Sequence, residues 1–130
     1  DIYPTLIDLA NLPHPQTQKL AGRSLAPLLE NPLAEWKGEA ITQILRPADS
    51  RLKKMTMGCS IRTARWRYTE WSEGKAGIEL YDHTEDPNEF HNLARDPSPE
   101  IRKQIGLLRK SLRLKSSGKT PTTPVNPPRL

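Results

Sequence analysis

A cluster of acidic and histidine side chains between positions 82 and 91 contains the groups of this chain best suited to binding a metal ion. Its oxygen and nitrogen donors are Asp82, His83, Glu85, Asp86, Glu89 and His91. A metal site needs ligands that converge from fixed elements, whereas hydrophilic groups on one turn mostly face water. Asp86 before Pro87 is typical of a helix start, and Glu89 stands three residues later, as in a capping box. Asn92 suits a helix end, so we predict a structural turn here and no metal site.

The only cysteine, Cys59, is the candidate for a thiolate nucleophile. Arg65 gives it the Cys-x5-Arg spacing of cysteine phosphatases, whose loop turns backbone N–H groups around a phosphate and leads into a helix. The residues between them contain no glycine, include the β-branched Ile61 and Thr63, and lead into a strand pattern. We therefore predict that Cys59 is a buried, unreactive strand residue, and we assign no catalytic residue to the chain.

Basic side chains gather between positions 46 and 57, which we interpret as a polar loop. Arginine and lysine supply charge-assisted hydrogen bonds to sulfate and carboxylate groups. The candidate substrate-binding residues are therefore Arg46, Arg51, Lys53 and Lys54, and the alternative is a solvated loop without a ligand. The aromatic residues Trp66, Tyr68 and Trp71 offer surfaces for stacking on sugar rings, but we favour a core position for them against the last helix.

An antiparallel sheet of about four strands is predicted to carry these groups. Its strand patterns cover residues 39–45, 59–63, 66–71 and 78–81. Ala64 and Arg65 form the turn of the central hairpin, and the alternation after it places Trp66 and Tyr68 on one face. Two glycines between positions 72 and 77 are able to take positive φ, which suits the next turn.

The strongest helix pattern covers residues 99–114. Ser98 is the expected N-cap, and Pro99 takes the first helical position, where its missing N–H is harmless. The apolar stripe of this helix consists of Ile101, Ile105, Leu108 and Leu112, and its other face is basic. The helix is therefore expected to pack its stripe on one face of the sheet.

Two shorter helices are predicted near the N-terminus. Asp1 is expected to cap the first, in which Ile2, Leu6 and Leu9 recur at helical spacing. Ser24 is expected to cap the second, over residues 24–29.

The charge of the chain is divided unevenly along its length. The 130 residues carry a net charge of +5, but residues 1–100 sum to −3 and residues 101–130 to +8. A basic nucleic-acid-binding domain carries its positive charge on its folded part, so nucleic acid is not an expected partner. The sequence contains no apolar run of 18 residues, so no membrane span is expected. A composition of 35% hydrophobic residues predicts a soluble protein with a modest core.

The segment from Ser60 to Ala94 resembles the closing segment of a type I, formylglycine-dependent sulfatase, and is closest to iduronate-2-sulfatase-like members. The residues that carry the resemblance are Ser60-Ile61-Arg62-Thr63, Trp66-Arg67-Tyr68-Thr69-Glu70-Trp71, Glu79-Leu80-Tyr81-Asp82, and Asp86-Pro87 with Glu89, Asn92, Leu93 and Ala94. The strings DIYPTLIDLANLP and LAGRSLAPLL, before position 30, also resemble the family's exit from its catalytic domain.

The resemblance implies an α+β fold with three parts. Residues 1–35 would be the end of an alkaline-phosphatase-like α/β catalytic domain, that is, remnant helices and a linker. Residues 36–115 would form the C-terminal subdomain, with an antiparallel sheet and a packed helix over 99–114. Residues 116–130, with five Pro or Gly among fifteen, are expected to be a disordered basic tail.

The same resemblance implies that the chain is a fragment of an enzyme. The family hydrolyses sulfate esters with a formylglycine and a calcium ion, both held by a catalytic domain upstream, and acts on sulfated sugars or polysaccharides. Neither its Cys-x-Pro-x-Arg motif nor its Asp-rich metal motif occurs here, because Cys59 is followed by Ser60, Ile61 and Arg62 without a proline. The chain begins at Asp1 without a methionine, so we expect an inactive fragment whose partner is the missing N-terminal catalytic domain.

The resemblance also places the basic loop. In a sulfatase it would reach the rim of the active-site cleft, and the family analogy implies an exported, periplasmic or lysosome-like setting. The alternative function is a non-catalytic module that binds an anionic polymer through the basic last helix and the tail.

Overall fold

The computed structural model describes residues 1–17, 20, 22–36, 38–49, 54–96 and 98–116. The chain divides into two compact units, Asp1–Lys37 and Gly38–Leu130. The first contains the helices α1 (Ile2–Leu9) and α2 (Ala26–Glu30). The second contains four strands, a short 3-10 helix and a long α-helix. Over the described residues, no helix combines the length and the apolar character needed to cross a membrane.

The helices of the first unit confirm the predicted elements, and their predicted caps are confirmed in part. The carboxylate of Asp1 makes no capping bond to α1 and instead accepts a hydrogen bond from the backbone N–H of Arg23 at 2.9 Å. The helix α2 begins later than predicted, with Leu25 at its N-cap position, but the hydroxyl of Ser24 accepts the N–H of Ala26, its first residue, at 3.2 Å. Thr5 joins the two segments, since its hydroxyl accepts a bond from the N–H of Leu25 at 2.8 Å.

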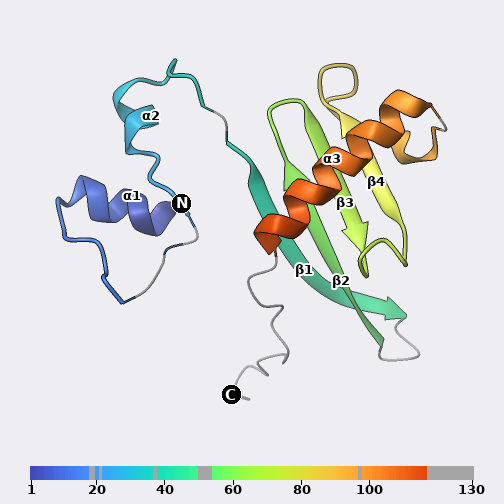
Figure 1. The fold of residues 1–130 in the computed structure, drawn as a ribbon, viewed down its shortest axis with the longest axis horizontal. Helices are drawn as coiled ribbons and strands as arrows, with labels where there is room; N and C mark the ends of the chain where they lie inside the picture. The colour runs from blue at the N-terminus through green and yellow to red at the C-terminus, as the bar shows by residue number, and fades with distance from the viewer. Residues whose placement is uncertain (18–19, 21, 37, 50–53, 97, 117–130) are drawn as a thin grey trace. The chain divides into compact units, whose positions relative to one another are not determined.

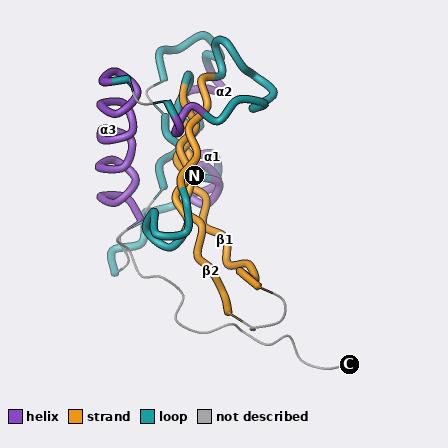
Figure 2. The backbone as a smooth tube through the Cα atoms, turned by 90° about the vertical axis from the view of Figure 1, so that its right-hand side faces the viewer, coloured by secondary structure: helices purple, strands orange, loops and turns teal. Residues whose placement is uncertain are grey.

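The second unit is an antiparallel meander covered by a helix. The strands β1 (Ala40–Asp49), β2 (Lys54–Arg62), β3 (Trp66–Trp71) and β4 (Ile78–Asp82) follow one another in the sheet in chain order. Figure 1 shows α3 (Pro99–Ser116) running across these strands, and Figure 2 shows it alongside one face of the sheet. We call this face the helix face and the opposite one the far face. The predicted α+β class, with its packed C-terminal helix, is confirmed.

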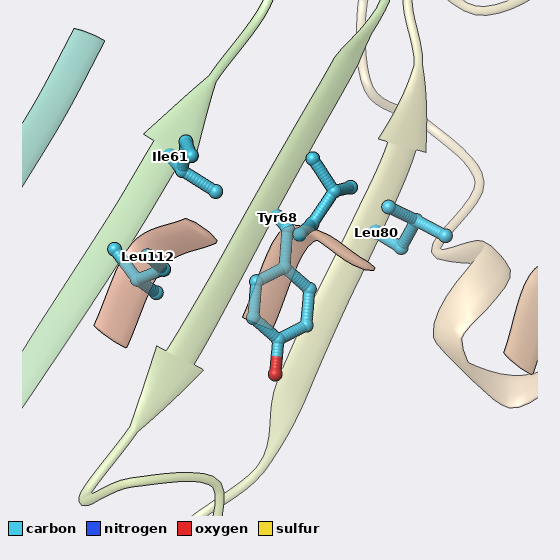
Figure 3. Packing of buried hydrophobic residues seen from close by; sticks show 5 residues of the cluster. Ile61, Tyr68, Leu80 and Leu112 are labelled. Atoms are coloured by element: carbon cyan, nitrogen blue, oxygen red, sulfur yellow. The ribbon is translucent and has the colours of Figure 1, made fainter. Parts of the chain in front are cut away.

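The core lies between α3 and the middle of the sheet. Cross-strand pairing places Ile61 of β2 opposite Tyr68 of β3, and Tyr68 opposite Leu80 of β4. Leu108 and Leu112 of α3 pack on this row, and all five side chains are buried (Figure 3). Burying an aliphatic or aromatic side chain contributes about 1.5–3 kcal/mol, so this row is the main apolar stabilisation of the unit.

The helix prediction was correct in its stripe and its start. Ile101 and Ile105 pack against the core, and the hydroxyl of Ser98 accepts a bond from the N–H of Ile101 at 3.3 Å. A polar network supports the same face. Tyr68 donates its hydroxyl to the buried carboxylate of Glu70 at 3.0 Å, and Arg109 donates to the Tyr68 hydroxyl at 3.0 Å. Burial raises the pKa of Tyr68.

The predicted polar loop over residues 46–57 was wrong, because most of this stretch forms the β1–β2 hairpin. Pro47 pairs with Met55, and the register shifts between Pro47 and Asp49. Strand β1 is the edge of the sheet, where a proline without an N–H is tolerated and a bulge is common. The basic residue Arg46 therefore lies on a strand, opposite Thr56.

The structural turn predicted over residues 82–91 is confirmed, but no helix begins at Asp86 and Pro87, so the capping-box interpretation was wrong. The carboxylate of Asp86 accepts the N–H of His91 at 2.8 Å, and Glu89 has φ of 60°. Asn92 precedes the 3-10 helix η1 (Leu93–Arg95) and accepts from Ala94. Its side chain also accepts from the N–H of Leu80 at 3.0 Å and donates to the carbonyl of Ile78 at 3.2 Å, so it satisfies backbone groups of β4 at the sheet edge.

Gly58 provides a test of the packing between β2 and β3. A Cβ at this position would lie 2.4 Å from Cζ3 of Trp71. We expect Gly58→Ala to lower the free energy of unfolding by about 1–3 kcal/mol, because the indole would have to shift. Gly106→Ala is the matched control, since nothing lies within 4 Å of its added Cβ and alanine favours a helix by about 1 kcal/mol. Urea unfolding measures both variants, and a Gly58→Ala chain as stable as the wild type would contradict this packing.

Candidate functional site

The far face of the sheet carries an arginine stacked on a tryptophan. The Cζ atom of Arg46 lies 3.5 Å from the centroid of the Trp71 ring. Gly58 pairs with Trp71 in the β2–β3 register, and the indole N–H donates to Glu79 on β4 at 3.0 Å. The hydrogen bond to Glu79 therefore fixes the edge of the indole on β4. The ring lies over the backbone of β2 at Gly58 and contacts the guanidinium of Arg46 from β1.

A shallow hollow adjoins this stack. It has a volume of ≈ 290 Å³, and it is lined by Arg46, Pro47, Thr56, Trp71 and Ala76. The guanidinium is exposed and carries donors in its own plane, so it is able to bind a sulfate or carboxylate from the solvent side. This is the arrangement of the described residues best suited to an anionic ligand.

The structure places one of the four predicted substrate-binding residues. Arg46 lies in β1, beside the hollow. Arg51, Lys53 and the side chain of Lys54 lie outside the described residues, so the structure does not bring the four together. Their assignment to a substrate stays a prediction.

The aromatic residues divide between the two faces. Tyr68 is buried on the helix face and Trp66 packs beside it, as predicted. The core position predicted for Trp71 was wrong, because residues 66, 68 and 70 alternate with residues 67, 69 and 71 along β3. Sequence reasoning missed the pairing of Trp71 with Gly58, although the signal was present. Counting outward from the two-residue turn at Ala64 and Arg65 pairs Gly58 with Trp71.

A second polar cluster links β2 and β3 to the turn after β4. His83 Nδ1 lies 2.9 Å from Arg62 Nη2, and His83 Nε2 lies 2.7 Å from Glu89 Oε1. Arg67 donates to both oxygens of Glu89, at 3.0 and 2.9 Å. These members of the predicted structural turn bind arginines of the sheet, and within the described part of the chain no three metal-ligating side chains come together.

Asp82 ends β4 and pairs with the hairpin turn. Arg65 donates from Nε to both carboxylate oxygens at 3.0 Å and from Nη2 to Oδ2 at 2.6 Å. The Arg65 guanidinium lowers the pKa of Asp82, and the N–H of Thr84 adds to this effect. The Asp82 side chain is 6% exposed and that of Arg65 is 56% exposed, so solvent screens the pair from one side.

Cys59 lies on the helix face of β2, and its thiol is partly rather than fully buried. The Gln43 amide donates to Sγ at 3.8 Å, and burial raises the pKa of the thiol. A thiol with a raised pKa is protonated at neutral pH and is a poor nucleophile. It borders a cleft of ≈ 540 Å³ whose lining includes Glu70 and Arg113, which pair with each other at 3.4 Å.

The Asp82 pair predicts a dependence of stability on pH. Because the folded-state pKa is lowered, the stabilisation is present above the unfolded value, near pH 4, and is lost as the pH falls through the folded value. We expect Asp82→Asn to cost about 1 kcal/mol at pH 7 and progressively less below pH 4. Thermal unfolding between pH 2 and 7 measures this difference. The exposed Glu85→Gln is the control, and a cost for Asp82→Asn that is independent of pH would refute the pairing.

Comparison with known proteins adds a family match to this geometry. The model described as "N-sulphoglucosamine sulphohydrolase, C-terminal" matches residues 1–116. The chain is 39% identical over 98 residues to a Δ4,5-hexuronate-2-O-sulfatase of Bacteroides thetaiotaomicron, with 75% of this chain and 19% of that protein covered. It is 34% identical over 102 residues to human arylsulfatase K, with 72% of this chain and 18% of that protein covered.

A solved structure agrees with these relatives. The fold is similar to that of a "2-O GAG sulfatase", with a TM-score of 0.63 and 31% sequence identity, covering 89% of this chain and 24% of that one. The chain spans about one fifth of the length of the curated relatives described above.

Proposed function

Because this chain belongs to the sulfatase family defined by the C-terminal region of N-sulphoglucosamine sulphohydrolase, we propose that it serves as the C-terminal subdomain of a larger sulfuric ester hydrolase. Its substrates are sulfated sugars or glycosaminoglycan-type polysaccharides. The names of two relatives, a hexuronate-2-O-sulfatase and a 2-O GAG sulfatase, support the finer assignment to an iduronate-2-sulfatase-like branch.

The observation that carries the proposal within the chain is the exposed guanidinium of Arg46. Sulfated sugars are anions, and a guanidinium binds sulfate and carboxylate oxygens through paired N–H donors. In the whole protein Arg46 would supply this cation at the rim of the active-site cleft, and Arg51, Lys53 and Lys54 remain proposed substrate-binding residues close to it in sequence. The subdomain thereby binds and orients the substrate.

Hydrolysis of a sulfate ester needs a formylglycine and a calcium ion, and the described residues of this chain do not suit either group. A formylglycine supplies the nucleophile in this family, but Cys59 is a partly buried strand residue bonded to Gln43, without the proline of the modification motif. Calcium needs several converging oxygen ligands, and the described acidic residues form no such group. We assign both groups to an N-terminal catalytic domain that is the partner of this chain.

The division of the chain supports the same arrangement. Residues 1–35 end the catalytic domain, and residues 36–115 form the subdomain; the boundary between the compact units, after Lys37, lies close to this division. The proposed tail, residues 116–130, lies outside the described residues except for Ser116.

The alternative of an anionic-polymer module relies on the basic face of α3. Several of its cations are already engaged. Arg109 and Arg113 each lie 3.4 Å from an oxygen of Glu70, and Lys115 pairs with Glu39. These pairs reduce the free positive charge of the helix, so the sulfatase assignment is preferred.

The assignment predicts that this chain alone is inactive and that the whole protein is active. The purified 130-residue chain is expected to leave an aryl sulfate intact, whereas the whole protein, with its catalytic domain, hydrolyses a 2-O-sulfated uronate. Arg46→Ala in the whole protein should raise KM about tenfold with a smaller change in kcat, because the guanidinium binds substrate and does not touch the sulfate ester bond. Lys110→Ala, on the exposed side of α3, is the matched loss of charge and should leave KM unchanged.

Two results would contradict the assignment. Hydrolysis of an aryl sulfate by the 130-residue chain alone would place the catalytic groups within it. A whole protein that binds heparin but hydrolyses no sulfate ester, and that loses binding when residues 109–130 are deleted, would favour the polymer-binding module.

A further inference from the structure

Arg46 differs from the other arginines of the sheet in what it contacts. Arg65 binds Asp82, Arg67 binds Glu89, and Arg62 lies against His83. The Arg46 side chain instead contacts the indole face of Trp71, with Cζ 3.5 Å from the ring centroid. Among the described arginines of β1 to β3 and their turn, Arg46 is therefore the one held by an aromatic ring in place of a hydrogen-bonding side chain.

Strand register explains how the ring reaches Arg46. Trp71 on β3 pairs with Gly58 on β2, and Gly58 pairs with Ile44 on β1. Arg46 follows Ile44 by two residues and so shares its face of the sheet. The indole crosses β2 above Gly58, where any Cβ would clash with it, and ends beneath the guanidinium. Glycine at 58 is therefore a condition for the stack.

Stacking fixes the guanidinium without occupying its donors. The five N–H groups of arginine lie in the plane of the guanidinium, whereas the ring contacts the face of that plane. A stacked arginine is also restricted in its rotamers, so less conformational entropy is lost when it binds an anion. The hydrogen bond from Trp71 to Glu79 fixes the indole in turn.

We propose that Gly58, Trp71 and Glu79 form a mount that presents the guanidinium of Arg46 to one oxyanion substituent, a sulfate or a carboxylate, of a sugar substrate. Trp71 is a positioning residue that acts through Arg46. The hollow of ≈ 290 Å³ beside the stack lies just below the usual range for ligand sites, about 300–1,000 Å³, which suits one substituent of one sugar unit. The inference rests on the proposed function for the identity of the sugar.

The test follows the side chain of Arg46 by NMR in the ¹⁵N-labelled 130-residue chain. Sodium sulfate and sodium glucuronate are titrated separately at constant ionic strength, with sodium chloride as the control. A saturable shift of the Arg46 Nε–H signal with sulfate, with glucuronate or with both supports the proposal and identifies the oxyanion. Absence of a shift, or the same shift with chloride, overturns it.

Variants separate positioning from general structure. Trp71→Ala should raise the Kd of the anion by about threefold to tenfold, which corresponds to the 0.5–1 kcal/mol of an exposed cation–π contact and the added cost of ordering the side chain. Trp71→Tyr should restore most of the affinity, because it keeps an aromatic face. Trp36→Ala is the control, since it removes another ring stacked under an arginine, Arg23, in the other unit. Unchanged anion affinity in Trp71→Ala would overturn the role of the mount.

Two further readouts keep the result interpretable. The backbone signal of Leu80, which bonds to Asn92, reports whether the sheet remains folded in each variant. If Trp71→Ala unfolds, Glu79→Gln tests the same claim, because it weakens the anchor of the indole while the ring remains. A loss of anion affinity in that variant supports the mount, and full affinity contradicts it.

Hydrolysis of a sulfate ester by the whole protein is measured in a separate experiment. A failed anion titration would therefore overturn the role of Arg46 and leave the proposed activity standing.

Discussion

The two-residue turn at Ala64 and Arg65 fixes the register between β2 and β3, and both faces of the sheet depend on that register. On the helix face it sets Ile61 beside Tyr68, which gives Leu108 and Leu112 of α3 a continuous apolar surface. On the far face it sets Gly58 opposite Trp71 and so makes room for the indole. A slip of one residue would exchange the two faces, expose the core row and bury the arginines of β2 and β3. Arg65, within the turn, adds its bond to Asp82 and so ties the hairpin to the end of β4.

Electrostatics divides the basic side chains of this unit into two groups. Arg65, Arg67, Arg109 and Arg113 each face a carboxylate, and these pairs join the sheet to its turns and to α3. They stabilise the fold and are poorly suited to bind a further anion, because a ligand would have to displace the carboxylate. Arg46 rests on an uncharged ring and keeps its charge available. The charge of Arg46 therefore remains available to an anionic ligand, as the proposed function requires.

The elements predicted from sequence are those in which local signals agree with the tertiary contacts. Strand β3 and the start of α3 follow from a clear turn, a proline at the first helical position and an apolar stripe. The β1–β2 hairpin was missed because Pro47 and the charged residues after it interrupt the alternation, which an edge strand tolerates. The turn after β4 was predicted, but the role of Glu89 was not, because its partners Arg67 and His83 are brought to it by the sheet and leave no local pattern. Strand alternation was sufficient to place Trp71 on the far face, but its aromatic character favoured a core assignment. The stack with Arg46 could not be predicted, because it depends on β1, whose full extent was missed.

The central claim is that Trp71 contributes to substrate binding only through Arg46. A double-mutant cycle in the whole protein tests it most directly, with kcat/KM for a 2-O-sulfated uronate measured for Arg46→Ala, Trp71→Ala and the double variant. If Trp71 acts through Arg46, the double variant loses no more than Arg46→Ala alone. If the two losses multiply, the residues act independently, and the mount does not exist as described.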